Sequence, residues 1–124
     1  MRIGEVSLQT NDVNRLADFY KWLLSTDNGS RDEEHQVILE GETALTVYND
    51  GSRKNNCKQN TALAVPVADV GREYQRLLDR GVLIVEGPTQ RPWGAKNLHF
   101  LDPGGNHVYF RSFPGKEADA QEKT

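Results

Sequence analysis

The chain of 124 residues has a formal net charge of −3 at pH 7, and its acidic and basic side chains are mixed along most of its length. This length supports one domain with a single core, and a slightly acidic chain without a basic stripe is a poor partner for nucleic acid. No apolar run approaches the roughly 20 residues that span a bilayer, and the N-terminal residues lead directly into a strand-like pattern, so we expect a cytoplasmic protein without a membrane segment.

The first half of the sequence predicts a strand, a helix and then further strands. Residues 3–10 alternate between apolar and polar side chains, which is typical of a half-buried strand. A polar residue, Asn11 or Asp12, then caps a helix whose apolar residues recur at helical spacing, and a polar segment containing glycine ends it. Two short strands are expected near residues 36–40 and 43–48.

The same pattern starts again in the second half. Residues 61–67 form an apolar strand, Asp69 is a plausible helix N-cap, and Gly81 is a favourable left-handed stop for the helix. A long loop, GPTQRP, separates the first of the later strands from the last two, which surround the turn DPGGN. These three strands are expected at residues 82–87, 95–101 and 107–113.

An internal repeat relates the two halves. Aligning the Asp-Val pair at residues 12–13 with the pair at residues 69–70 also aligns apolar strand positions: Val6 with Leu63, and Leu8 with Val65. Each half therefore predicts a strand, a helix and three strands. The expected fold class is α+β, built from two βαβββ modules.

The two modules are expected to form one domain over residues 1–113. The first module covers about residues 1–50 and the second about residues 60–113. The remaining segment, residues 114–124, has no apolar residues apart from alanine, so we expect a flexible polar tail.

The helix of a βαβββ module covers one face of its sheet and leaves the other face bare. Two modules can hide their bare faces by closing toward each other around a central cleft. Side chains that alternate away from the helix would line that cleft, and a functional site is expected there. They are Glu5, Ser7 and Gln9 in the first strand, and Ala62 and Ala64 in the strand at residues 61–67.

The duplicated layout and the closing segment PWGAKNLHFLDPGGNHVYF together resemble the vicinal oxygen chelate superfamily. This superfamily includes glyoxalase I, extradiol dioxygenases, fosfomycin resistance enzymes and bleomycin resistance proteins. The resemblance extends from Ile3 to about Phe113, and the PWG motif with NTALAVPV is most similar to the bleomycin resistance branch. It implies a curved mixed sheet with a central cleft and, in that branch, a homodimer whose two clefts are built from both subunits.

Enzymatic members of this superfamily hold a divalent metal with His, Glu or Gln side chains on four strands. Carried over to this sequence, those four positions fall on Glu5, Thr46, Ala62 and Tyr109, with an uncertainty of about one residue at Thr46. Glu5 alone is a good ligand, because alanine has no donor atom and the oxygens of threonine and neutral tyrosine bind divalent metals weakly. The resemblance therefore implies that the usual metal site is absent.

Two histidines leave an alternative open. His99 and His107 flank the DPGGN turn on adjacent predicted strands and could approach one another. They would either form a different metal site or make a cross-strand contact or a hydrogen bond in the pocket.

Without a metal, the predicted cleft offers groups that recognise a polar, partly aromatic or cationic small molecule. Trp93, held between proline and glycine, can present its ring for stacking or cation–π contact, or it can pack the loop or a subunit interface. Glu5 can bind a cation, act as a general base, or form a salt bridge to Arg111 or Lys96. The predicted ligand-binding residues are Glu5, Ser7, Thr46, Tyr48, Ala62, Trp93, Tyr109 and Arg111.

The leading hypothesis is a metal-independent, cofactor-free homodimer that binds a small molecule and sequesters an antibiotic or another aromatic or cationic ligand. The alternative is an enzyme: a glyoxalase-like lyase or isomerase, or a dioxygenase-related protein, that uses a divalent metal or Glu5 as base. In a third reading the domain is a structural or regulatory partner whose cleft is filled by its own aromatic side chains, among them Phe100, Tyr109, Phe110 and Phe113.

Overall fold

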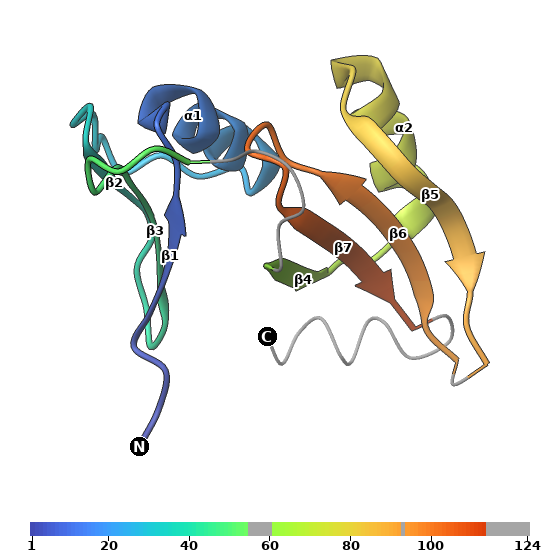
Figure 1. Ribbon diagram of the computed structural model, residues 1–124. Coiled ribbons are helices and arrows are strands. Elements are labelled where there is room, and N and C mark those ends of the chain that lie inside the picture. The colour runs from blue at the N-terminus through green and yellow to red at the C-terminus, as the bar shows by residue number, and fades with distance from the viewer. Residues whose placement is uncertain (55–60, 93, 114–124) are drawn as a thin grey trace. The chain divides into compact units, whose positions relative to one another are not determined.

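The computed structural model describes residues 1–54, 61–92 and 94–113, and the chain divides into two compact units between residues 58 and 59. Each unit has a helix packed on a sheet that contains both parallel and antiparallel strands (Figure 1). The predicted fold class, α+β with two βαβββ-like modules, is therefore confirmed.

The first unit consists of β1 (Glu5–Gln9), α1 (Val13–Leu23), β2 (His35–Leu39) and β3 (Ala44–Tyr48). Its sheet has the order β1-β3-β2, in which β3 is parallel to β1 and antiparallel to β2. Helix α1 begins where predicted, because the Asp12 carboxylate accepts a hydrogen bond of 3.2 Å from the Arg15 backbone N–H. The core between helix and sheet contains Leu8, Val13, Leu16, Tyr20, Ile38 and Val47.

The sequence located two strands after the first helix while counting three for each module, and the described part of the first unit has the two that were located. Between α1 and β2, residues 24–34 form no strand, so this module has two strands after its helix in the described part of the chain. Side-chain oxygens of Asp27, Asn28 and Asp32 accept hydrogen bonds from backbone N–H groups two residues further on. These local turns engage N–H groups that a strand would have offered to a neighbour.

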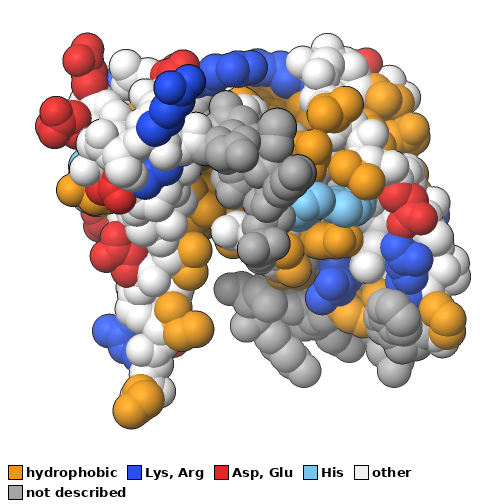
Figure 2. Space-filling view, viewed as in Figure 1, with side chains coloured by type: hydrophobic (Ala, Val, Ile, Leu, Met, Phe, Trp, Pro, Cys, Tyr) orange, Lys and Arg blue, Asp and Glu red, His pale blue; other side chains and the backbone are white. Residues whose placement is uncertain are grey.

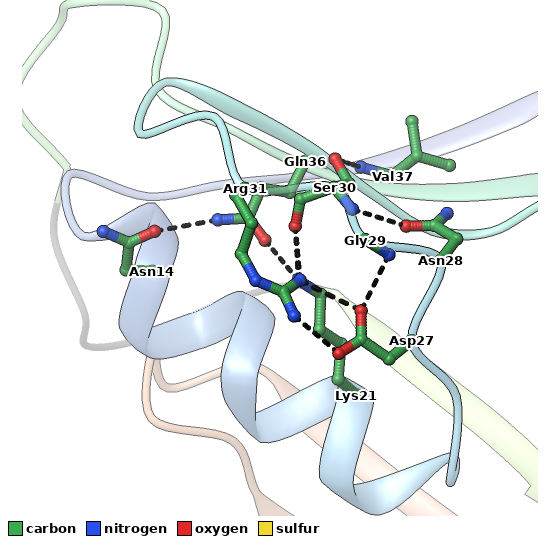
Figure 3. A network of polar contacts seen from close by, with 9 residues as sticks. All are labelled: Asn14, Lys21, Asp27, Asn28, Gly29, Ser30, Arg31, Gln36 and Val37. Carbon is green, nitrogen blue, oxygen red and sulfur yellow. Dashed lines mark hydrogen bonds and ion pairs between the residues drawn. The ribbon is translucent and has the colours of Figure 1, made fainter.

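A buried polar network holds this loop to the helix and the sheet (Figure 3). The Lys21 ammonium, only 8% exposed, donates to the backbone oxygen of Ser30 at 2.6 Å and to Gln36 Oε1 at 2.7 Å. Gln36 in turn donates to Asn14 Oδ1 at 2.8 Å. The carboxylate of Asp27 lies 4.0 Å from Lys21 and pairs more closely with Arg31. Neutral oxygens therefore provide the hydrogen bonds of this buried cation.

The second unit consists of β4 (Ala62–Pro66), α2 (Val70–Arg80), β5 (Leu83–Gln90), β6 (Lys96–Leu101) and β7 (His107–Ser112). Its sheet has the order β4-β7-β6-β5, with β4 parallel to β7 and the other pairs antiparallel. The Asp69 side chain caps α2 as predicted, and Gly81 ends the helix in the left-handed conformation, with φ of 78°.

Substitution of Gly81 by alanine should lower the free energy of unfolding by about 1 kcal/mol, because an L-residue pays for the left-handed backbone. Gly41→Ala is the matched control. A Cβ would meet no atom within 4 Å at either position, but the backbone of Gly41 lies outside the left-handed region. Urea unfolding measures both values, and equal effects of the two substitutions would contradict this account.

Strand β5 is longer than the sequence indicates. The expected loop GPTQRP belongs to β5 as far as Gln90, and the pairing with β6 shifts register between Glu86 and Thr89. Pro88 lies inside this irregular stretch. Proline has no N–H to donate to a ladder, so it is accommodated at a bulge rather than in regular pairing.

The two faces of the second sheet differ in chemistry. On the side of α2, the apolar side chains of β6 and β7 are buried, and the Phe100 and Phe110 rings pack edge to face with centroids 5.0 Å apart. Alternate residues point to the other face, which we call the open face. Since Phe100 and Phe110 lie in the core, neither fills the open face, as the third reading of the sequence would require of them.

Candidate functional site

The face of the first sheet that points away from α1, which we also call its open face, brings together three of the predicted binding residues. In the parallel pairing of β1 with β3, Glu5 lies opposite Ala44, and Ser7 lies opposite Thr46. The buried Thr46 hydroxyl donates to Glu5 Oε2 at 2.8 Å, and Gln9 donates to the Ser7 hydroxyl at 3.1 Å. This strand pair therefore presents an exposed carboxylate, fixed on one side by a threonine, beside a hydroxyl and an amide.

Tyr48 lies at the end of the same pair of strands. It is opposite Gln9 on β1 and opposite His35 on β2, and its exposed ring contacts the His35 ring edge to face at 5.6 Å. Tyr48 was the fourth binding residue predicted in the first unit, and its neighbours are Gln9 and His35.

The open face of the second sheet carries the other described candidates. Ala64 lies opposite Tyr109 across the parallel pair β4–β7, and Pro66 lies opposite Arg111. Ala62 lies opposite His107, and each is two residues before the pair of Ala64 and Tyr109. The small residues of β4 thus lie beside the larger polar side chains of β7.

The internal repeat extends to the pairing of strands. The pairing of Ser7 with Thr46 in the first unit is repeated by the pairing of Ala64 with Tyr109 in the second. Thr46 and Tyr109 therefore occupy corresponding places in the two repeats, while their assignment to the family's metal positions stays a prediction.

The donors at the four positions do not fit a divalent metal of the kind that the family's enzymes hold. They are a carboxylate, a threonine hydroxyl, a methyl group and a phenol, of which one is a strong ligand. The Glu5 carboxylate already accepts the Thr46 hydroxyl. In the described ranges, 1–54, 61–92 and 94–113, no three His, Cys, Asp or Glu side chains are grouped so that they could hold a metal ion.

His99 and His107 are in direct contact. His99 Nε2 lies 2.8 Å from His107 Nδ1. The Tyr109 ring also stacks on the His99 ring, with centroids 4.2 Å apart and planes at 14°. Figure 2 shows histidine side chains, in pale blue, exposed beside hydrophobic ones. Because one ring must accept the hydrogen bond, both rings cannot be protonated while the contact lasts. The cross-strand hydrogen bond is the reading that this geometry supports.

Acid should destabilise the protein through His99. Burial lowers the pKa of the His99 ring below its ordinary value, and His107 lowers it further, with Glu86 opposing and Arg91 reinforcing the shift. The unfolded chain then binds a proton at a higher pH than the folded chain does. The free energy of unfolding should therefore fall as the pH decreases through the ordinary histidine range, near about 6.5.

The test compares urea unfolding of the wild-type and His99→Gln proteins at several pH values between neutral and mildly acidic. The variant is expected to lose less stability on acidification than the wild type. Parallel pH profiles for the two proteins would show that His99 does not contribute to the acid sensitivity.

Asn97 is a residue of the open face that sequence reasoning missed. It is 5% exposed, lies opposite Arg111 on β6, and accepts a hydrogen bond of 3.3 Å from Arg111 Nε. Asn97 comes two residues before His99 on β6, so the alternation of side chains along the strand places both on the same face, and this was the available signal. Nearby, Glu86 and Arg91 form an ion pair with each other.

Four expectations are not addressed by this geometry. Trp93 and the tail at residues 114–124 lie outside the described residues. The central cleft and the salt bridges from Glu5 to Arg111 or Lys96 would join the two units, and they stay predictions. Among the helices of the described part of the chain, none is long and apolar enough to cross a membrane.

Comparison with known proteins identifies one matching family model. The model described as Glyoxalase/Bleomycin resistance protein/Dioxygenase superfamily matches residues 2–110. The sequence matches none of the curated proteins.

Several solved structures share the fold at low sequence identity. A glyoxalase/bleomycin resistance protein/dioxygenase from Nocardioides is 20% identical, with a TM-score of 0.72 over 93% of this chain and 85% of that one. A glyoxalase-related enzyme from Fulvimarina pelagi is 18% identical, with a TM-score of 0.75 over 90% and 87%. A lactoylglutathione lyase from Agrobacterium tumefaciens is 17% identical, with a TM-score of 0.69 over 89% and 92%. At these identities the likeness concerns the fold alone.

Proposed function

Because this chain belongs to the Glyoxalase/Bleomycin resistance protein/Dioxygenase superfamily, we propose that it is a small-molecule binding protein of the bleomycin resistance type, which sequesters its ligand without a metal. The observation that carries the proposal is the chemistry of the open faces. They present hydrogen-bonding and aromatic side chains at positions where the family's enzymes hold a metal, and the donors there do not fit one.

Glu5 is the anchor expected for a cationic or hydrogen-bond-donating group of the ligand. Its carboxylate is exposed, one oxygen is oriented by Thr46, and no cation of the first unit lies within ion-pair distance of it among residues 1–54. A carboxylate that is fixed in place but not neutralised can form a charge-assisted hydrogen bond with a ligand. The same group would serve as a base in an enzyme, so turnover must be measured beside binding.

Isothermal titration with two probes, bleomycin and benzamidinium, tests the proposal. We expect saturable binding of at least one probe by protein treated with a chelator, and a loss of about 10-fold in affinity for Glu5→Gln. Glu33→Gln, which alters an exposed acid in the loop before β2, is the matched control and should leave affinity unchanged. Absence of binding, or equal affinity of wild type and Glu5→Gln, contradicts the assignment.

Homodimerisation is part of the same proposal. The edge strand β5 exposes Leu83 and Val85, which is the kind of apolar edge that a second chain can cover. Sedimentation equilibrium should give the mass of two chains, and Val85→Lys should favour a single chain. A single-chain mass for the wild-type protein at every concentration would refute this part.

A further inference from the structure

The open face of the second sheet carries a cation, Arg111, that no described carboxylate of its own unit neutralises. Glu86 and Arg91 pair with each other at the β5 side of the face. Arg111, on β7, has no carboxylate within ion-pair distance among residues 61–92 and 94–113 of its own unit. A half-buried positive charge without an opposite charge is costly, and an anion bound from solution would offset that cost.

Asn97 orients the Arg111 guanidinium. Its amide oxygen accepts the Nε–H of Arg111 at 3.3 Å, and the amide itself is buried on the neighbouring strand. The terminal nitrogens of Arg111 make no hydrogen bond to any described residue of the second unit. They form a planar pair of donors whose geometry matches the two oxygens of a carboxylate or of a phosphate.

An aromatic surface lies next to this cation. Tyr109 is two residues before Arg111 on the same face of β7, a separation of about 7 Å along the strand. Its ring is held by the stack on His99, with centroids 4.2 Å apart. The facing strand β4 has Ala64 opposite Tyr109 and Pro66 opposite Arg111, neither of which offers a charge or a side-chain donor.

We propose that this face binds a small organic acid, whose carboxylate or phosphate group pairs with Arg111 and whose planar part lies on Tyr109. The inference rests on the proposed function, since it names a chemical class for the ligand. The acidic group is the part of the ligand that the second unit would recognise. We expect a compound in which the acidic group is joined directly to the ring, because Tyr109 and Arg111 are only two residues apart on β7, about 7 Å.

The experiment titrates the full chain with benzoate, phenyl phosphate, inorganic phosphate, the neutral amide benzamide and the cation benzamidinium. Affinity is measured by calorimetry, and the Arg111 Nε–H and Asn97 amide signals are followed by two-dimensional NMR. We expect benzoate or phenyl phosphate to bind and to shift both signals, and benzamide to bind about 10-fold more weakly or not at all. Preference between benzoate and phenyl phosphate decides whether the acid is a carboxylate or a phosphate.

Arg111→Gln should weaken binding of the preferred acid by about 10- to 100-fold. Arg111→Lys, which keeps the charge and loses the planar pair of donors, should fall between the variant and the wild type. Arg72→Gln, at an exposed position of α2, is the matched control and should bind as the wild type does. The NMR spectrum of each variant shows whether the fold is retained.

Two results would overturn the inference. Wild-type affinity in a folded Arg111→Gln protein removes Arg111 from the site, and inorganic phosphate binding as tightly as phenyl phosphate removes Tyr109. Binding of bleomycin or benzamidinium that depends on Glu5, without any binding of the acids, rejects this inference alone. If no probe of either set binds, both this inference and the proposed function are wrong.

Discussion

Replacing Phe110 with alanine is expected to lower the free energy of unfolding by about 3–5 kcal/mol. The ring is 1% exposed on the helix side of β7, and it packs edge to face against Phe100, which is fully buried. Removing it leaves a cavity between α2 and its sheet, and Phe100 loses an aromatic partner. Urea unfolding followed by circular dichroism measures the change.

Leu78→Ala in the same unit is the control. Leu78 lies on α2 and is 45% exposed, so its truncation should change stability by about 0.5 kcal/mol or less. A loss below about 1 kcal/mol for Phe110→Ala would mean that the second core is packed differently from the arrangement described here.

Gln36→Leu should lower the free energy of unfolding by about 2–4 kcal/mol, which is more than the loss of one neutral hydrogen bond would cost. The substitution removes an acceptor from Lys21, whose ammonium is 8% exposed and has Ser30 as its other close acceptor (Figure 3). It also leaves the Asn14 amide oxygen without its donor. A buried cation that loses a hydrogen bond is destabilised more strongly than a neutral group.

The double variant Lys21→Met, Gln36→Leu provides the decisive comparison. Replacing both partners by apolar side chains removes the buried charge with its acceptor, so the double variant should be more stable than Gln36→Leu alone. Urea unfolding of the wild type, the two single variants and the double variant gives the coupling energy between the residues. Additive losses would show that Lys21 does not depend on Gln36.

Much of the fold could be predicted from local patterns in the sequence. The caps at Asp12 and Asp69 and the stop at Gly81 lie where the pattern placed them, because these signals act over a few residues. The strand at residues 107–113 was placed correctly, but the sequence left open which of its aromatic residues face the helix, and the structure buries Phe110 there while Tyr109 and Arg111 lie on the other face.

The errors arose where a side chain competes with the backbone or where pairing decides the structure. The sequence counted three strands after each helix but located only two in the first half, and the loop before them is held instead by Asp27, Asn28 and Asp32, whose side chains accept hydrogen bonds from its backbone. The extension of β5 through Pro88 depends on the bulged pairing with β6, which the sequence of β5 alone does not specify.

The candidate site was predictable as a set of faces but not as a set of contacts. Alternation put Glu5 and Ser7 on one face of the first sheet, yet the hydrogen bond from Thr46 depends on the register of β1 against β3. The contact of His99 with Tyr109 likewise follows from the antiparallel register of β6 against β7. Alternation along β6 could have placed Asn97 on the face of His99, but its contact with Arg111 depends on the register of β6 against β7.

The central claim is that the protein binds its ligand without a metal. Elemental analysis of the untagged protein, before and after chelator treatment, combined with calorimetric titration of bleomycin and benzamidinium, tests it most directly. The account predicts no stoichiometric divalent metal and the same ligand affinity before and after treatment. The claim would be contradicted by a divalent metal that is bound in a one-to-one ratio and whose removal abolishes ligand binding or turnover. That result would favour an enzyme.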